Sequence, residues 1–287
     1  MKRIKLLIIP LLILLTGCTL FKRDDMENIN VITTIYPLEY SIDYLYGQSS
    51  IISSVYPDDI NVDEYELTDK QIKDNSEKDL FIYMGLTSDS DIAVKLINNN
   101  KNLKLIDATF GMEYKQDVSE LWLNPSNLLM ILQNIKNGLD EYIDNAYLKI
   151  EINDRYKALK LELSELDASL KATIENANKK TIYANSKSAL FLEKYGLTVI
   201  VVDEKNELYE KNLALLKEAI DNKNVTYFYR FEDTTLPKGV KELVDGNKIK
   251  ELEFRNLKNI TDEERKNKDT YVNLTERNIE NLKKELY

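Results

Sequence analysis

The sequence predicts an α/β fold of two βα lobes, each a mainly parallel sheet flanked by helices, joined by one long connecting helix. Three observations predict it. Apolar, β-rich runs alternate with segments that can form helices; this alternation stops and later resumes; and one long amphipathic segment lies between the two series. Strands separated by helices favour parallel pairing, because a crossover helix returns the chain to the same end of the sheet.

Four apolar runs predict the strands of an N-terminal α/β lobe at residues 29–140, and four more predict those of a C-terminal α/β lobe at residues 180–287. The first four are residues 30–36, 50–56, 79–84 and 103–107, and the second four are residues 180–184, 198–203, 225–231 and 248–254. The mature chain of about 260 residues is long enough for two domains of ordinary size.

Residues 141–179 predict the connecting helix. Apolar residues recur there at spacings of three and four: Leu148, Ile152, Tyr156, Leu159, Leu163, Leu166, Leu170 and Ile174. This segment contains no proline or glycine. About 30 helical residues at about 1.5 Å each would extend about 45 Å, enough to pass both lobes. A coiled-coil stalk is the alternative, but a single stripe between two βα series favours packing along both lobes.

The N-terminus has the pattern of a lipoprotein signal peptide, residues 1–17. Three basic residues precede an apolar run at positions 6–15, which is too short to span a membrane, and Thr16 and Gly17 precede Cys18. We expect cleavage before Cys18 and its diacylation, since two acyl chains anchor a protein stably. Residues 18–28 would then be a disordered tether. The alternative is an ordinary secretory signal with an incidental cysteine.

Charge and cysteine content exclude several classes of function. The formal net charge is −10, and removal of the three basic signal residues gives −10 − 3 = −13, so we expect no nucleic-acid binding. Cys18 is the only cysteine, which excludes an internal disulfide. An enzyme is not expected either, because the chain has no histidine base, no Gly-x-Ser-x-Gly motif and only 8 glycines.

Several short segments resemble the metal-binding lipoproteins of ABC transporters, the ZnuA-like family that supplies zinc or manganese to a permease. They are residues 31–37 (VITTIYP), 66–72 (ELTDKQI), 79–85 (DLFIYMG), 121–125 (LWLNP), 195–197 (YGL) and 269–271 (DTY), with Asn278, Leu282 and Leu286. The resemblance covers nearly the whole mature chain. It implies a monomeric, extracytoplasmic, membrane-anchored solute-binding protein whose partners are an ABC permease and, through it, an ATPase.

The resemblance also implies a metal site between the lobes, typically of three histidines and one carboxylate, but this chain has no histidine. Counting along the matched segments places the histidine positions on Asp63, Glu120 and Asn185, and the acidic position on Arg255. Three of the four have a plainer alternative: Asp63 in a solvated acidic turn, Asn185 as a helix N-cap, and Arg255 as a surface arginine on an edge strand. Glu120, two residues before the only tryptophan, favours a specific role.

These substitutions predict an altered or lost metal site. Carboxylate and amide oxygens suit harder ions such as manganese or calcium better than zinc, so Asp63 and Glu120 are the candidate metal ligands if any exist. A guanidinium at Arg255 would repel a divalent cation, and we hypothesise that it replaces the metal by pairing with Asp63 and Glu120. A receptor or scaffold that keeps the fold without binding metal is the alternative function.

Overall fold

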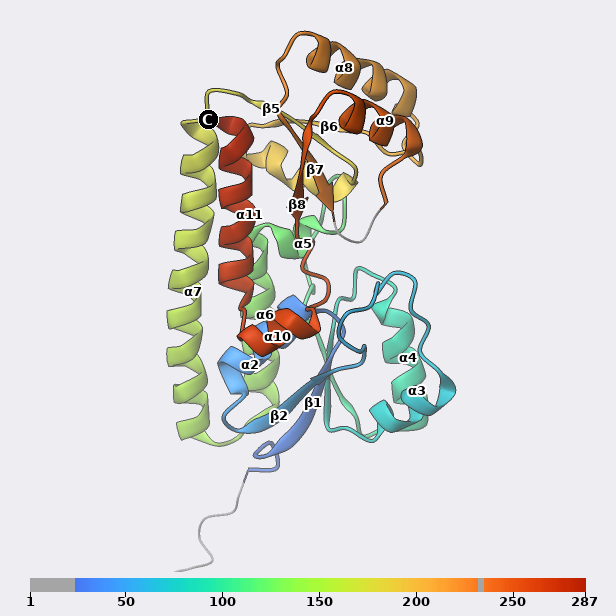
Figure 1. The fold of residues 1–287 in the computed structure, drawn as a ribbon. Helices are drawn as coiled ribbons and strands as arrows, with labels where there is room; N and C mark the ends of the chain where they lie inside the picture. Colours follow the sequence, from blue (N-terminus) through green and yellow to red (C-terminus); the bar gives the residue numbers. More distant parts are fainter. Residues whose placement is uncertain (1–23, 232–234) are drawn as a thin grey trace, which may run out of the picture.

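The computed structural model describes residues 24–231 and 235–287, which form two α/β lobes with a long helix, α7, along one side (Figure 1). The strands of the N-terminal lobe are β1 (Ile29–Thr33), β2 (Ser50–Ser54), β3 (Leu80–Tyr83) and β4 (Lys104–Asp107). Those of the C-terminal lobe are β5 (Thr181–Ala184), β6 (Thr198–Val201), β7 (Tyr227–Phe231) and β8 (Lys250–Phe254).

Both sheets are parallel and have the same strand order. The N-terminal sheet runs β2-β1-β3-β4 and the C-terminal sheet runs β6-β5-β7-β8. In each, the first strand of the lobe pairs with the second on one side and with the third on the other. The winding direction therefore reverses between β1 and β3 and between β5 and β7, and the carboxyl ends of such strands are where open α/β sheets usually bind ligands.

Helices complete each lobe. The N-terminal half contains α2 (Tyr36–Tyr46), α3 (Asp69–Ser76), α4 (Asp89–Asn99), α5 (Glu120–Leu123) and α6 (Pro125–Tyr142). The C-terminal half contains the 3₁₀ helix η2 (Lys187–Tyr195), α8 (Tyr209–Asp221), α9 (Lys238–Gly246), α10 (Asp262–Asn267) and α11 (Tyr271–Leu286). In Figure 1, α3 and α4 cover one side of the N-terminal sheet, and α8 and α9 lie at the far end of the C-terminal lobe.

Helix α7 (Ala146–Glu175, 30 residues) packs along both lobes. Its apolar stripe is buried as predicted, except that Tyr156 is half-buried and donates its hydroxyl to Gln133 Oε1 at 2.6 Å. One hydrophobic core cluster contains Val31 of the first sheet, Leu163 of α7 and Tyr229 of the second sheet. The two lobes therefore share a continuous core along this helix.

After β8 the chain returns to the N-terminal lobe before it ends in the C-terminal lobe. We call residues 255–270 the crossover segment; it includes α10, which lies against the N-terminal lobe near α2 (Figure 1). Helix α11 then runs back beside α7 (Figure 1). Three stretches of chain thus link the lobes: α7, the crossover segment and α11.

The predicted fold class is confirmed, and all eight predicted strands are present. The long helix lies inside the predicted range of 141–179. The prediction of a disordered tether is wrong for the last residues of the tether, because Met26 is fully buried and Asp24 Oδ2 accepts a hydrogen bond from the Asp144 amide at 2.8 Å.

The signal peptide and Cys18 lie outside the described residues. Within residues 24–231 and 235–287, no helix combines the length and apolarity that crossing a membrane requires.

Candidate ligand site at the carboxyl ends of the N-terminal sheet

A cavity of about 340 Å³ opens at the carboxyl ends of three strands in the N-terminal lobe. Its lining includes Ile35, Tyr56 and Met84, which follow β1, β2 and β3 in the chain, and Lys258 of the crossover segment. This is the point at which the winding of the sheet reverses, and its volume is within the usual range for a small-molecule site. The cavity is the strongest candidate site in the described chain.

Asp89 is the buried charged group of this cavity. It begins α4, is only 6% exposed and lines the cavity. Its Oδ2 accepts hydrogen bonds from the Thr34 hydroxyl and from the Met84 amide at 3.2 Å. Burial raises the pKa of the Asp89 carboxyl, and these hydrogen bonds, a further one with the Thr87 side chain and the Lys258 charge oppose that rise. Asp89 therefore ties the end of β1 to the end of β3.

Aromatic rings form much of the remaining wall: Tyr56, Tyr65, Tyr114 and Trp122. The rings of Tyr56 and Tyr65 meet edge to face, with centroids 5.9 Å apart. Burial raises the pKa of Tyr56 to about 12, so this phenol stays neutral at physiological pH. The Trp122 indole donates to the Asn256 carbonyl at 2.7 Å, which fixes the ring against the crossover segment.

Asp63, a predicted ligand, lines the same cavity but already has a cation beside it. Both of its carboxylate oxygens accept from the Lys258 ammonium, which lies 5.5 Å from the Trp122 ring centroid. The Asp63 side chain is 58% exposed and that of Lys258 is 20% exposed. Because the pair is partly exposed, it is worth little stability, yet it places a positive charge next to a predicted metal ligand.

Glu120 holds its own loop. Its carboxylate accepts the backbone amides of Gln116 at 2.8 Å and Asp117 at 3.2 Å, in the turn before α5. Gln116 in turn donates to Glu193 of η2 at 2.8 Å. The Glu120 carboxylate thus stabilises a turn that contacts the C-terminal lobe.

Asn185 is buried at the reversal point of the C-terminal sheet. Its Oδ1 accepts the Phe231 amide at 2.8 Å, and its own amide donates to the Tyr229 carbonyl at 3.2 Å, so it joins the ends of β5 and β7. The predicted alternative role as an N-cap is wrong, because Ser186 caps η2 by accepting the Ser188 amide.

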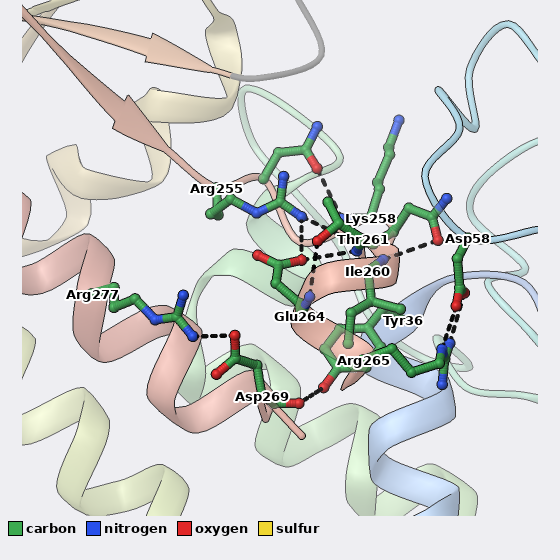
Figure 2. A network of polar contacts seen from close by, with 12 residues as sticks. Tyr36, Asp58, Arg255, Lys258, Ile260, Thr261, Glu264, Arg265, Asp269 and Arg277 are labelled. Carbon is green, nitrogen blue, oxygen red and sulfur yellow. Dashed lines mark hydrogen bonds and ion pairs between the residues drawn. The ribbon is translucent and has the colours of Figure 1, made fainter. Parts of the chain in front are cut away.

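Arg255 is largely buried and pairs within the crossover segment (Figure 2). Its guanidinium donates to Glu264 at 2.9 Å and to the Asn259 carbonyl at 3.1 Å. It lines a second cavity of about 350 Å³, which adjoins the first at Lys258. The hypothesis of pairing with Asp63 and Glu120 is therefore corrected: these two carboxylates bind Lys258 and backbone amides, respectively.

The crossover segment is fastened to the N-terminal lobe by further contacts (Figure 2). Arg265 pairs with Asp58, after β2, as Figure 2 shows. It also pairs with Glu39 of α2. The Tyr36 hydroxyl donates to the Asp269 carbonyl at 2.9 Å, and the Tyr36 amide donates to the Lys258 carbonyl at 2.9 Å. These bonds hold Lys258 at the mouth of the cavity.

The described donors do not fit a zinc site of the type that the resemblance implies. The sequence has no histidine, and among residues 24–231 and 235–287 no group of three or more aspartate, glutamate or cysteine side chains could hold a metal ion. Zinc needs about four close nitrogen, sulfur or oxygen ligands.

Sequence reasoning missed Asp89, Lys258 and Arg265. Asp89 has a recognisable local signal in the sequence, because it is an aspartate that begins a helix just after a buried strand. Lys258 and Asp63 are 195 residues apart, and no local pattern in the sequence pairs them.

The family model described as "Zinc-uptake complex component A periplasmic", ZnuA, matches residues 31–285. The chain belongs to this family. The zinc-binding lipoprotein AdcA of Streptococcus pneumoniae is 24% identical over 99% of this chain and 61% of its own length. The zinc-binding protein AdcA of Streptococcus pyogenes is 22% identical over 89% of this chain and 55% of its own length. The chain thus spans about three fifths of the length of these curated relatives.

Solved structures share the fold. The Zn(II)-bound ZnuA-like domain of Streptococcus pneumoniae AdcA has a TM-score of 0.75 at 21% identity, with 90% of this chain and 99% of that chain covered. The metal-dependent lipoprotein YcdH of Bacillus subtilis has a TM-score of 0.76 at 20% identity, with the same coverage. The predicted family resemblance is confirmed. The four predicted site residues stay predictions, because none of these comparisons tests them.

Proposed function

We propose that this chain is the extracytoplasmic solute-binding lipoprotein of a metal-ion type ABC importer, with an altered or lost metal site. It would take up its ligand between the lobes and deliver it to the permease. The observation that carries this proposal is the family match over residues 31–285, together with the two-lobed fold. Membership of a binding-protein family also argues against an enzyme.

The anchor and partners follow from the same proposal. Cys18 would carry two acyl chains, and an AdcA relative is named as a lipoprotein. The folded part would then stay at the outer face of the cytoplasmic membrane, as a monomer beside the permease, which contacts the ATPase. A Cys18→Ser variant is expected to leave the membrane fraction, and its retention there would argue against lipidation.

Zinc and manganese are the ions that the family implies, but the donors favour a changed ligand. The Lys258 ammonium beside Asp63 repels a divalent cation. We expect calorimetric titration of the purified chain with zinc, manganese, iron and calcium to show no stoichiometric tight binding. Tight binding that Asp63→Asn or Glu120→Gln abolishes would instead restore these residues as metal ligands.

A cross-linking experiment tests the transport role. The full chain, tagged at its C-terminus in its own cells, is cross-linked, and the captured proteins are identified by mass spectrometry. Recovery of an ABC permease supports the proposal. Capture without any permease or ATPase, at a depth that detects other membrane proteins, would favour the receptor or scaffold alternative.

A further inference from the structure

The charges around the 340 Å³ cavity do not balance. Its lining contains two carboxylates, Asp63 and Asp89, and one ammonium, Lys258. Lys258 is bound to Asp63 through both carboxylate oxygens, so Asp89 remains as the carboxylate without its own ion-pair partner among the described lining residues. With both carboxylates ionised, the lining as a whole carries one net negative charge.

The Asp89 carboxylate can accept a further hydrogen bond. The hydrogen bonds from Thr34 and Met84 fall on Oδ2, and the Thr87 side chain is a third partner of the carboxylate. A carboxylate offers about four lone-pair sites, so with three partners it keeps capacity for one further donor. The residue is only 6% exposed yet lines the cavity, so a donor that enters the cavity can reach a carboxylate that is largely shielded from water.

The aromatic wall selects the kind of cation. Tyr56, Tyr65, Tyr114 and Trp122 line the same cavity, and Trp122 already has the Lys258 ammonium 5.5 Å from its ring centroid. Rings of this type attract organic cations through their faces and bury the attached carbon atoms. A hydrated metal ion gains little from such walls, because it requires several oxygen ligands.

We infer that this cavity binds a small organic monocation, with its ammonium group on Asp89 and its carbon skeleton among Tyr56, Tyr65 and Trp122. One positive charge balances the lining. A divalent ion would exceed that balance and meet the Lys258 ammonium. The inference rests on the proposed function and names the substrate class of its ligand site: a compact amine-bearing solute in place of a metal.

Calorimetric titration of the purified full chain tests this inference with defined probes. n-Butylammonium and choline are the cationic probes, and n-butanol is the neutral counterpart of n-butylammonium. Each is titrated into the unaltered chain, into Asp89→Asn and into Asp91→Asn. The Asp89→Asn side chain would keep an oxygen for the Thr34 and Met84 hydrogen bonds but lose the charge. Asp91 lies two residues further along α4 and is exposed, so its substitution is the matched loss of one charge.

We expect 1:1 binding of at least one cationic probe, and no comparable binding of n-butanol. Asp89→Asn should weaken the cation by about 10- to 100-fold, since hydrogen bonds to charged groups are worth about 1.5–3 kcal/mol and about 1.4 kcal/mol is tenfold. Asp91→Asn should bind as the unaltered chain does. Binding of both cations no tighter than n-butanol, or unchanged binding by Asp89→Asn, would overturn the inference.

The two proposals can fail separately. If the permease is captured by cross-linking but neither cation binds, the organic-cation assignment is wrong and the transport role stands. If n-butylammonium binds through Asp89 but no permease is captured, the cavity assignment stands and the transport role is wrong.

Discussion

Replacement of Arg265 by alanine is the most informative test of how the crossover segment is held. The guanidinium lies between two elements of the N-terminal lobe, 2.7 Å from Glu39 Oε1 and 2.8 Å from Asp58 Oδ1. The hydrogen bonds to both carboxylates raise the pKa of Arg265, so it stays charged at any working pH. The two carboxylate side chains are only 13% and 19% exposed, whereas that of Arg265 is 43% exposed.

The expected loss is about 2 kcal/mol. Each of the two partly exposed ion pairs contributes about 0.5 kcal/mol, the middle of the usual range for such pairs. Without the guanidinium, Glu39 and Asp58 would be two shielded carboxylates on either side of one gap, which adds part of the cost of leaving charged groups without a partner, about 1 kcal/mol. For a chain of this size the change corresponds to a fall in Tm of about 4–8 °C.

Thermal unfolding followed by circular dichroism measures this change. The matched control is Lys238→Ala, because the Lys238 side chain is 89% exposed and its ammonium is 3.8 Å from Glu242. We expect the control to change stability by less than about 0.5 kcal/mol. The Arg265→Ala deficit should shrink at about 1 M salt, which screens charges beyond about 3 Å. If Arg265→Ala unfolds at the same temperature as Lys238→Ala, the crossover segment is held by something other than these pairs.

Three further predictions concern the core and the cavity. Burial raises the pKa of Asp89, so its carboxyl binds a proton more readily in the folded chain than in the unfolded chain, and the stability that this gives is lost as pH rises through the folded-state pKa. The Tm of Asp89→Asn relative to that of the unaltered chain should therefore increase as pH rises above about 4, the ordinary pKa of aspartate. A flat difference would contradict this. Asn185→Ala removes the acceptor of the buried Phe231 amide and should cost about 1–3 kcal/mol in urea unfolding, whereas exposed Asn247→Ala should cost less than about 0.5 kcal/mol. Leu163→Ala, in the buried stripe of α7, should lower the free energy of unfolding by about 2–5 kcal/mol. Leu161→Ala is the control, because Leu161 is 60% exposed. If Leu163→Ala costs no more than Leu161→Ala, α7 does not carry the shared core.

The elements of the fold were predictable because their signals are local. A run such as residues 79–84 is apolar and β-branched or aromatic over the length of one strand, and it became β3. The stripe from Leu148 to Ile174 has helical spacing with no proline or glycine to interrupt it, and it became α7. The alternative of Asn185 as the cap of η2 is off by one residue, since Asn185 and Ser186 are both good cap residues and only the sheet contact of Asn185 decides between them.

The candidate site was predictable only in part, because its decisive contacts join distant segments. Counting along matched segments found Asp63, which does line the cavity. It could not find Lys258, whose position depends on the return of the chain from β8 to the N-terminal lobe. A cation does lie beside Asp63, but it is Lys258; Arg255 pairs instead with Glu264 of α10 in the crossover segment.

Under the proposed function, the charges fixed at the cavity would change the ligand while the fold is kept. Here the N-terminal lobe places Asp63 and Asp89 at one cavity and the crossover segment adds Lys258, so one negative charge remains. A site with that charge is balanced by a monocation. The lobes meanwhile stay joined by α7, α11 and the Arg265 ion pairs, none of which requires a bound ion.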